Sequence, residues 1–324
     1  MTELEFQIEN FMVYCSSRGL STKTLSSYEQ TLKLFAIYLK ETFDIEDAKK
    51  VQSGHIRQYI KYLQERGKYT VVANEQSKKI NHPDKRPDHG KKISMTTIAN
   101  YVRNIKVFFN YLYEIERELK KNPVENIDNP KVERKIKKLL TPEEIKKVLD
   151  QFDKTKFHGY RNWMITRLLL DTGCRIGEVV SIEPKHIDFQ HKSILITNPK
   201  NKQQRYVYFS AKLSTELKSW LKFHDRYSDS PYLFPTTKGT KLDIRNYETA
   251  LREAGKKANI EIHPHQLRNN FAKFYILNGG DWFSLSRILG HSSVEVTQKA
   301  YLDFTDEEIG KKYQKHSPLA FLDI

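Results

Sequence analysis

The sequence is poor in cysteine and has no long apolar segment. Its two cysteines, Cys15 and Cys174, are far apart, and each lies in an apolar helical pattern. This arrangement favours neither a disulfide framework nor a CxxC metal site. The first residues, MTELEFQIENF, are acidic and amphipathic, and no uninterrupted apolar run approaches membrane-spanning length. We therefore expect a cytoplasmic protein that is neither exported nor inserted in a membrane.

Several motifs that carry common phosphoryl-transfer or hydrolytic chemistry are also missing. The sequence has no GxxxxGK phosphate-binding loop, no HExxH pair and no clustered acidic set suited to a divalent metal. We therefore expect neither a nucleotide cofactor nor a metal ion.

Positive charge is abundant. Lysine and arginine number 55 against 40 aspartates and glutamates, which gives a net charge of +15 and an isoelectric point of about 9.4 over 324 residues. A field of this sign attracts polyanions and raises their association rate, so double-stranded DNA is the expected partner. A basic soluble protein without such a partner is the alternative.

The first third of the chain is predicted to be a helical domain, residues 1–121. Four segments repeat apolar residues at three- and four-residue steps, which is typical of amphipathic helices. Their ranges are 6–19, 27–41, 53–67 and 94–116. Residues 74–92, NEQSKKINHPDKRPDHGKK, are polar and lack periodicity, so they are interpreted as a mobile basic loop. Such a loop either contacts DNA or is only solvated.

A linker is predicted over residues 122–137, where prolines and lysines are frequent and apolar residues few. The second domain, 138–324, then opens with a capping box at Thr141 and Glu144. Two β-rich runs, 193–197 and 204–210, flank a polar lysine-bearing turn and predict a hairpin between helices. The fold class is therefore mainly α with a small antiparallel β-sheet, ending in a tail at 302–324.

The second domain contains four stretches with chemically active side chains. They are TGCRIGE with Arg175 and Glu178, NPKNKQQR with Lys200, HPHQLR with His265 and Arg268, and LGHSSVEVTQKAY with His291 and Tyr301. His265 and Arg268 are three residues apart, so one helical face presents both to a small anion such as phosphate. Taken singly, an arginine here is more often a surface ion pair, a histidine a cap and a tyrosine part of the core.

Together and in this order, the four stretches resemble the tyrosine recombinase (phage integrase) family over nearly the whole chain. That family has an arginine in a T-G-x-R-x-x-E context, a lysine in a β-hairpin, an H-x-x-R pair, an L-G-H motif and a tyrosine shortly after. The resemblance implies a two-domain recombinase, with a helical core-binding domain followed by a catalytic domain.

The resemblance also implies a role for each residue. Tyr301 is the nucleophile, and Arg175 and Arg268 hold the non-bridging oxygens of one phosphodiester. The remaining residues transfer protons or support the site. His265 is the acid/base partner, Lys200 donates a proton to the departing 5′-oxygen, and His291 donates to the phosphate. Glu178 either orients Arg175 or forms a surface ion pair with it.

Two features depart from the family pattern. Asn269 follows Arg268 where a histidine is more usual, and Tyr301 lies ten residues after His291 instead of nine, a position here held by Ala300. Lys202 is close to Lys200 in the same turn, but the spacing of Lys200 from Arg205 fits the family hairpin better.

By the same resemblance, four subunits act on two DNA sites. The apolar end of the tail, Leu319, Phe321, Leu322 and Ile324, is expected to dock on a neighbouring subunit in trans. An accessory directionality factor and a place on the nucleoid are further expectations. We expect integration or excision of a mobile element, because the segment 74–92 departs from the compact Xer-type plan. Xer-like dimer resolution, a type IB topoisomerase and a catalytically silent DNA-binding regulator are the alternatives.

Overall fold

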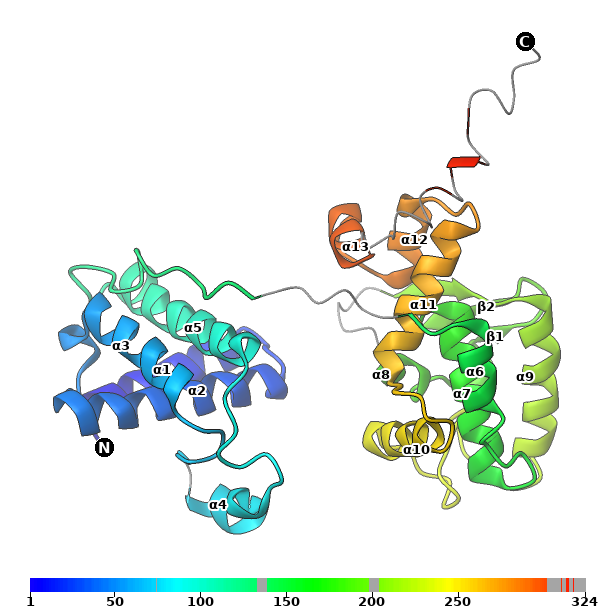
Figure 1. Cartoon of the computed structure of the whole chain (residues 1–324), viewed down its shortest axis with the longest axis horizontal. Helices are drawn as coiled ribbons and strands as arrows, with labels where there is room; N and C mark the ends of the chain where they lie inside the picture. The colour runs from blue at the N-terminus through cyan, green and yellow to red at the C-terminus, as the bar shows by residue number, and fades with distance from the viewer. Residues whose placement is uncertain are drawn as a thin grey trace. The chain divides into compact units, whose positions relative to one another are not determined.

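The computed structural model of the chain describes residues 1–73, 75–132, 139–197 and 204–301, with isolated residues at 310, 313, 314 and 317 (Figure 1). The chain divides into two compact units, Met1–Lys135 and Ile136–Ile324. Each unit has its own hydrophobic core. The boundaries predicted from the sequence, with a linker at 122–137, remain a prediction.

The first unit is helical, and all four helices predicted from periodicity are present. Its helices are α1 Glu3–Ser17, α2 Thr22–Phe43, α3 Ser53–Glu65, α4 Glu75–Asn81 and α5 Met95–Asn110, with short turns η1 Ala48–Lys50, η2 Pro83–Lys85 and the π-helical η3 Tyr111–Ile115. Side-chain caps fix three of the helix starts, at Thr2, Ser21 and Ser94. Each cap satisfies a backbone N–H that the first helical turn leaves unpaired.

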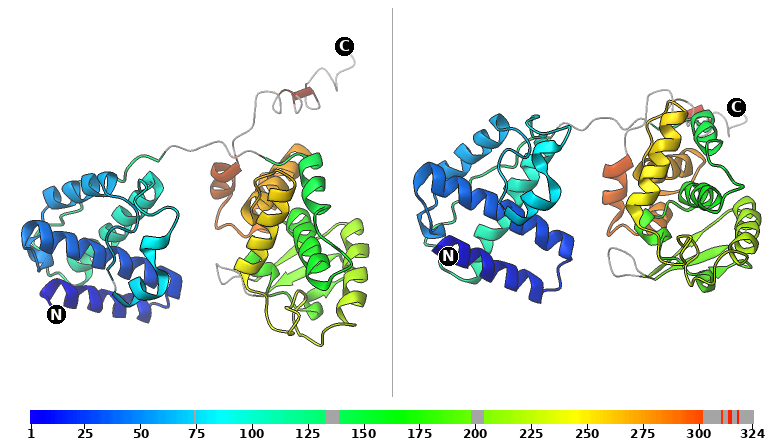
Figure 2. Two further views of the ribbon diagram at one scale, coloured as in Figure 1. Left: turned by 60° about the horizontal axis from the view of Figure 1, so that its bottom comes forward. Right: turned by 90° about the horizontal axis from the view of Figure 1, so that it is seen from below.

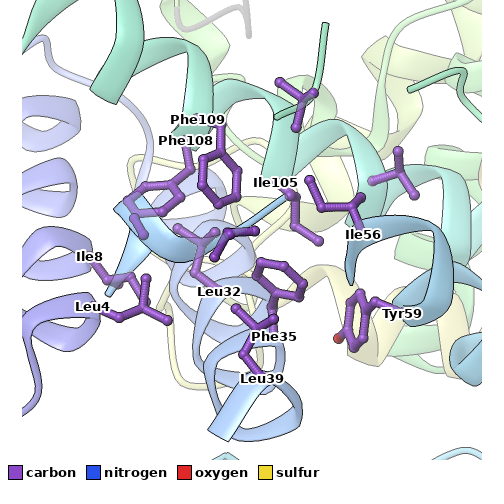
Figure 3. Close-up of a cluster of buried hydrophobic side chains, with 14 of the residues drawn as sticks. Leu4, Ile8, Leu32, Phe35, Leu39, Ile56, Tyr59, Ile105, Phe108 and Phe109 are labelled. Carbon is purple, nitrogen blue, oxygen red and sulfur yellow. The ribbon is translucent and has the colours of Figure 1, made fainter. Parts of the chain in front are cut away.

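Aliphatic and aromatic side chains together form the core between α1, α2, α3 and α5 (Figure 3). The rings of Phe11 and Phe108 have their centroids 5.5 Å apart, and those of Phe35 and Tyr59 are 4.9 Å apart. All four side chains are at most 1% exposed. Aromatic contacts of this kind add about 0.5–1.5 kcal/mol per pair to the burial itself.

The prediction of a loop over 74–92 was wrong for part of its length, because α4 and η2 lie inside it. The sequence of α4, EQSKKIN, contains good helix formers but no apolar periodicity, since its described side chains at 78–81 are exposed and Ile80 retains 77% of its surface. The base of the segment is closed by two backbone bonds, Lys68 N–H to Lys91 O at 2.8 Å and Gly90 N–H to Lys68 O at 2.9 Å. A Cβ at Gly67 would lie 2.7 Å from the Gly90 backbone, so this close crossing requires glycine.

The second unit combines helices with one small sheet, which confirms the predicted fold class. Its elements are α6 Pro142–Leu149, α7 Phe157–Thr172, α8 Ile176–Val179, η4 Pro184–His186, β1 Ile187–Asp188, β2 Ser193–Ile196, β3 Arg205–Tyr208, α9 Ala211–His224, α10 Ile244–Lys257, α11 Pro264–Leu277, α12 Trp282–Leu289 and α13 Val294–Tyr301. The three strands form an antiparallel sheet in the order β1-β2-β3. The predicted hairpin is β2 and β3, paired from Ser193 with Tyr208 to Ile196 with Arg205.

Helix α7 is central to this unit and packs against both α9 and α11 (Figure 2). Its buried face includes Met164, Ile165, Leu168 and Leu169, all without exposed surface. The predicted capping box opens α6, where the Glu144 N–H donates to Thr141 Oγ1 at 3.2 Å and the Thr141 N–H to Glu144 Oε2 at 2.9 Å. Over the described residues, no helix combines the length and apolarity needed to cross a membrane.

Candidate active site

The site begins where α7 ends. Gly173 adopts a left-handed conformation at the helix C-terminus, and a Cβ there would lie 2.2 Å from the Phe271 ring. Two residues later Arg175 occupies the N-cap of α8. Arg268, on the second turn of α11, donates from Nη1 to the Gly173 carbonyl at 2.7 Å. The α7 terminus thus lies beside both arginines that the motifs predict.

Three guanidinium groups meet at the C-terminus of α12. The Leu289 carbonyl accepts from Arg268 Nη2 at 2.8 Å and from Arg175 Nη1 at 3.3 Å. The Ile288 carbonyl accepts from Arg205 Nε at 2.8 Å. The last carbonyls of a helix have no partner within the helix and carry partial negative charge, so they are natural acceptors for cations. The end of α12 therefore binds the side chains of Arg175, Arg205 and Arg268, which we call the three-arginine cluster.

Gly290 makes this gathering possible. It ends α12 with φ of +63°, a conformation that glycine adopts without strain. A Cβ at this position would come within 3.0 Å of the Arg205 side chain. The glycine of the L-G-H motif thus both stops the helix and leaves room for a guanidinium beside its last carbonyls.

Glu178 is the carboxylate of the cluster. Its Oε1 and Oε2 accept from Arg205 at 2.9 and 2.8 Å, and Oε1 also accepts from Arg175 Nη1 at 3.1 Å. Burial by itself raises the pKa of this carboxyl, but the hydrogen bonds and charges of Arg205 and Arg175 outweigh burial and hold the pKa below its usual value. Because Glu178 is only 4% exposed, it is a buried support for Arg175 and not a surface ion pair.

His291 connects the cluster to α13. Its Nε2 lies 3.0 Å from Arg268 Nη2, and its Nδ1 lies 2.8 Å from the hydroxyl of the buried Thr297. Burial, followed by the charges of Arg268 and Arg175, lowers the pKa of His291 to about 4, so the imidazole is neutral near pH 7. A guanidinium only donates, so Nε2 accepts from Arg268 and the Nδ1 proton goes to Thr297. In this arrangement His291 is an acceptor, whereas the motif predicts a donor to phosphate.

The other predicted residues are placed less completely. His265 lies in the first turn of α11, exposed, and contributes to the lowered pKa of His291, which places it close to the cluster. Tyr301 is the last residue of α13, a helix that packs against α12 and α11; its side chain is outside the described part of the structure. Lys200 and the alternative Lys202 lie outside the described residues.

Asn269, the first departure from the family motif, is 3% exposed. Neither its Oδ1 nor its Nδ2 has a hydrogen-bond partner among the residues that the structure describes. Beside it, Asn270 exchanges two bonds with the Leu140 backbone, 3.3 Å from the amide and 2.7 Å to the carbonyl. Of the two asparagines that follow Arg268, Asn270 therefore anchors the start of the second unit.

Sequence reasoning missed Arg205 and Thr297. Arg205 begins a predicted strand. Because side chains alternate between the two faces of a strand, Arg205 shares its face with the buried Val207. A charged residue on the inward face of a strand is a signal, since such residues are rarely buried unless paired. Thr297 has no comparable signal, because a threonine in a short helix is usual.

The arrangement favours binding of an anion. Three arginines against one glutamate leave two net positive charges, and His291 adds none while it is neutral. Arg175 keeps 28% of its side chain exposed, whereas Arg268 is 2% exposed. A single phosphodiester can meet both guanidiniums with charge-assisted hydrogen bonds.

The neutral state of His291 makes stability depend on pH. Between its ordinary pKa of 6.5 and about 4, the unfolded chain binds a proton at this residue that the folded chain does not. The free energy of unfolding should therefore fall as pH drops from about 6.5 towards 4. Between pH 7.5 and 5 we expect wild type to lose about 1–2 kcal/mol more than His291→Gln, discounted for partial solvent screening.

Urea unfolding of the full chain at the two pH values measures this difference. His158→Gln is the matched control, because His158 is an exposed histidine of the same unit. Equal pH dependence in wild type and His291→Gln would contradict a neutral, half-buried His291.

Two family models match the chain. The phage integrase family model matches residues 138–308, and the model of the phage integrase N-terminal SAM-like domain matches residues 8–77. Since the first covers more than half of the chain, the protein belongs to the phage integrase family. Its curated relatives are tyrosine recombinases, which makes it a tyrosine site-specific recombinase and an enzyme.

The curated relatives are of this family, and a solved structure shares the fold. A tyrosine recombinase of Pseudothermotoga lettingae is 30% identical over 311 residues, 94% of this chain and 96% of that protein. Tyrosine recombinase XerC of Bacillus pumilus is 31% identical over 240 residues, 71% of this chain and 78% of the relative. The Tn1549 transposon integrase, solved with a circular intermediate DNA, has a TM-score of 0.71 at 17% identity and covers 98% of this chain and 100% of that one.

Proposed function

We propose that this recombinase cuts and rejoins DNA through a 3′-phosphotyrosyl link to Tyr301. The observation that carries the proposal is the convergence of Arg175 and Arg268 on the Leu289 carbonyl, 3.3 and 2.8 Å away. Two guanidiniums held at one point suit one phosphodiester and oppose the charge of its transition state. They supply the stabilisation that a metal ion gives in other phosphoryl-transfer enzymes.

The reaction needs a nucleophile and a leaving group with matched proton transfers. A phenol has a pKa near 10, so the Tyr301 proton must pass to a base, and His265 takes this role. As the phenol oxygen bonds to phosphorus, the bond from phosphorus to the 5′-oxygen breaks, and Lys200 gives that oxygen a proton. The free 5′-hydroxyl can then attack the phosphotyrosine of a partner strand and restore the DNA backbone without an external energy source.

His291 takes part through a change of partner. In the structure Arg268 donates to its Nε2. A bound phosphate oxygen competes for that guanidinium proton, and once Nε2 is released the imidazole can carry its proton there and donate to the phosphate. This reconciles the acceptor state of His291 with the donor role that the family motif assigns to it.

DNA binding rests on both units of the chain. The net charge of +15 suits a polyanion, and the SAM-like match covers residues 8–77 of the first unit. We assign residues 1–121 to a core-binding domain, 122–137 to a linker and 138–324 to catalysis. The nucleoid in the cytoplasm is the expected site of action, since DNA is the substrate.

For the biological role we propose integration or excision of a mobile element. The observation in its favour is the segment 67–92, which is closed at its base by Gly67 and Gly90 and contains its own helix, an addition to a compact helical bundle. Xer-like resolution of chromosome or plasmid dimers is the second candidate, favoured by the many relatives named XerC and XerD.

Sequencing the DNA that becomes covalently trapped on the protein in its host distinguishes these roles. Trapped sites at the two ends of one DNA segment, absent from strains that lack the segment, support integration and excision. A single trapped site per chromosome, present in all strains, supports dimer resolution instead. Scattered sites without a common sequence would point to a type IB topoisomerase.

Assembly as a homotetramer on two DNA sites, with an accessory directionality factor, completes the proposal. Assembly can be tested by removing the C-terminal tail, whose apolar end, 319–324, lies outside the described residues. Truncation after Ser317 should leave binding to one half-site within about twofold and reduce cooperative binding of a second subunit by tenfold or more, about 1.4 kcal/mol. Band-shift titration on one and two half-sites measures both. Equal loss of both would indicate that the tail packs on its own subunit.

A further inference from the structure

Thr297 is a buried threonine whose hydroxyl meets the imidazole of His291. It lies in α13, has no exposed surface, and its Oγ1 is 2.8 Å from His291 Nδ1. A threonine side chain has few rotamers in a helix, because its branched Cβ crowds the preceding turn. The hydroxyl is therefore a fixed partner for one ring nitrogen, supplied by α13, while Arg268 reaches the other ring nitrogen from α11.

The main chain of His291 is held in place as well. Its N–H donates to the Ser286 carbonyl at 3.1 Å, and Ser286 Oγ donates to the Ser293 carbonyl at 3.1 Å. These two bonds tie the segment between α12 and α13 to α12. With the main chain held, two side-chain torsions orient the imidazole. The bond from Nδ1 to Thr297 restrains them and leaves Nε2 facing Arg268, 3.0 Å away.

A hydroxyl suits both states that the reaction requires of His291. In the structure Arg268 donates to Nε2, so the ring proton is on Nδ1 and Thr297 Oγ1 accepts it. When phosphate takes the guanidinium proton, Nε2 gains a proton from water and Nδ1 loses one to water, so the ring stays neutral and donates to the phosphate. Because a hydroxyl both accepts and donates, Thr297 then donates to Nδ1. A carbonyl or carboxylate only accepts and would favour the first state alone.

We propose that Thr297 is a positioning residue for His291, whose hydroxyl holds the imidazole with Nε2 towards the three-arginine cluster in both tautomers. The inference rests on the proposed function, in which His291 donates to the phosphate that Arg175 and Arg268 bind. Thr297 has no exposed surface, so it does not touch the phosphate and acts only through the imidazole.

Two substitutions separate the hydroxyl of Thr297 from its packing. Thr297→Val replaces the hydroxyl by a methyl group of similar size, whereas Thr297→Ser keeps the hydroxyl and loses a methyl group. We expect Thr297→Val to cleave DNA roughly 10–100-fold more slowly than wild type, the usual cost of losing a group that orients a metal-binding histidine. Thr297→Ser should stay within about threefold of wild type, since it still orients the ring. Band shifts should show both variants binding DNA within about twofold of wild type.

Thr166→Val is the matched control for loss of a buried threonine hydroxyl. Thr166 is 1% exposed, and its hydroxyl bonds to the Asn162 carbonyl at 2.8 Å and to the Tyr247 hydroxyl at 2.9 Å. Neither partner belongs to the three-arginine cluster. This substitution should lower thermal stability and leave the cleavage rate of the folded protein unchanged.

A double-mutant cycle with His291→Ala shows whether Thr297 acts through the imidazole. In the His291→Ala background, Thr297→Val should slow cleavage by less than about threefold, because the hydroxyl has no ring to orient. If Thr297→Val costs the same factor in both backgrounds, or costs nothing while His291→Ala is slow, only the positioning role falls. If His291→Ala cleaves at the wild-type rate, the donor role of His291 in the proposed function falls, and this inference with it.

The tautomer of His291 provides a measurement that needs no substitution at position 297. Nitrogen-15 spectra of the histidine-labelled full chain near pH 7.5 report which ring nitrogen carries the proton, and the resonances missing from His291→Ala are those of His291. We expect the proton on Nδ1 in wild type without DNA and in Thr297→Ser. A wild-type ring protonated at Nε2 overturns the inference, even where Thr297→Val does not fold.

Discussion

Tyr301→Phe should form no covalent adduct with DNA, whereas wild type forms one in EDTA. The phenol oxygen is the only atom that the substitution removes, and phenylalanine offers no nucleophile in its place. Chemistry of this kind is lost by many orders of magnitude and not merely slowed. A denaturing gel on nicked substrate DNA measures the adduct directly, and a band shift on the same DNA should be unchanged within about twofold.

Tyr313→Phe is the matched control, because Tyr313 is the next tyrosine along the chain and is 58% exposed. This variant should form the adduct at the wild-type rate. An adduct that survives in Tyr301→Phe and disappears in Tyr313→Phe would move the nucleophile. Tight binding without an adduct from any of the three proteins would support the catalytically silent regulator, and the ten-residue interval between His291 and Tyr301 would then be its cause.

Arg175→Ala should bind DNA almost normally and cleave it roughly 10³–10⁵-fold more slowly, the cost of losing a comparable arginine in other phosphoryl-transfer enzymes. Arg175 is the better choice for this test, since its side chain is 28% exposed, whereas Arg268 is 2% exposed and its loss also leaves the Gly173 carbonyl without its partner. Single-turnover cleavage and equilibrium binding on the same DNA give the two quantities.

Arg167→Ala provides the control for loss of a paired arginine. Arg167 forms a two-bond pair with Glu216, at 2.9 and 2.6 Å, but it is not part of the three-arginine cluster. Its loss should change thermal stability with little effect on the cleavage rate. If binding and cleavage fell in parallel in Arg175→Ala, this arginine would hold DNA in the ground state and not in the transition state.

The sequence predicted those helices that bury an apolar face. Helices α1, α2, α3 and α5 of the first unit and the β2–β3 hairpin were recognised because burial imposes a period on apolar residues. Helix α4 was missed for the converse reason. Ile80 is its most apolar residue and is exposed, so no packing requirement marks the segment, and only helix propensity distinguishes it from a loop.

The site was predictable as far as its motifs reach. Arg175, Arg268 and His291 meet within hydrogen-bond distance of one another or of the Leu289 carbonyl, as their shared motif order implies. Of their supports, the sequence indicated Glu178 but not the backbone carbonyls at 173 and 289, which have no residue-type signature. The acceptor state of His291 depends on Thr297 and Arg268 together, and this relation exists only in three dimensions.

The use of main-chain oxygens at the end of α12 also bears on how such a site can diverge. A substitution at position 288 or 289 alters a side chain but leaves its carbonyl in place, so the arginines keep their acceptors through many changes of sequence. The position that cannot vary freely is Gly290, where a Cβ would meet Arg205 within 3.0 Å and where the helix must stop. The three guanidiniums therefore depend on the backbone of this helix and on Gly290, whereas the Leu289 side chain serves the hydrophobic core, where it is fully buried.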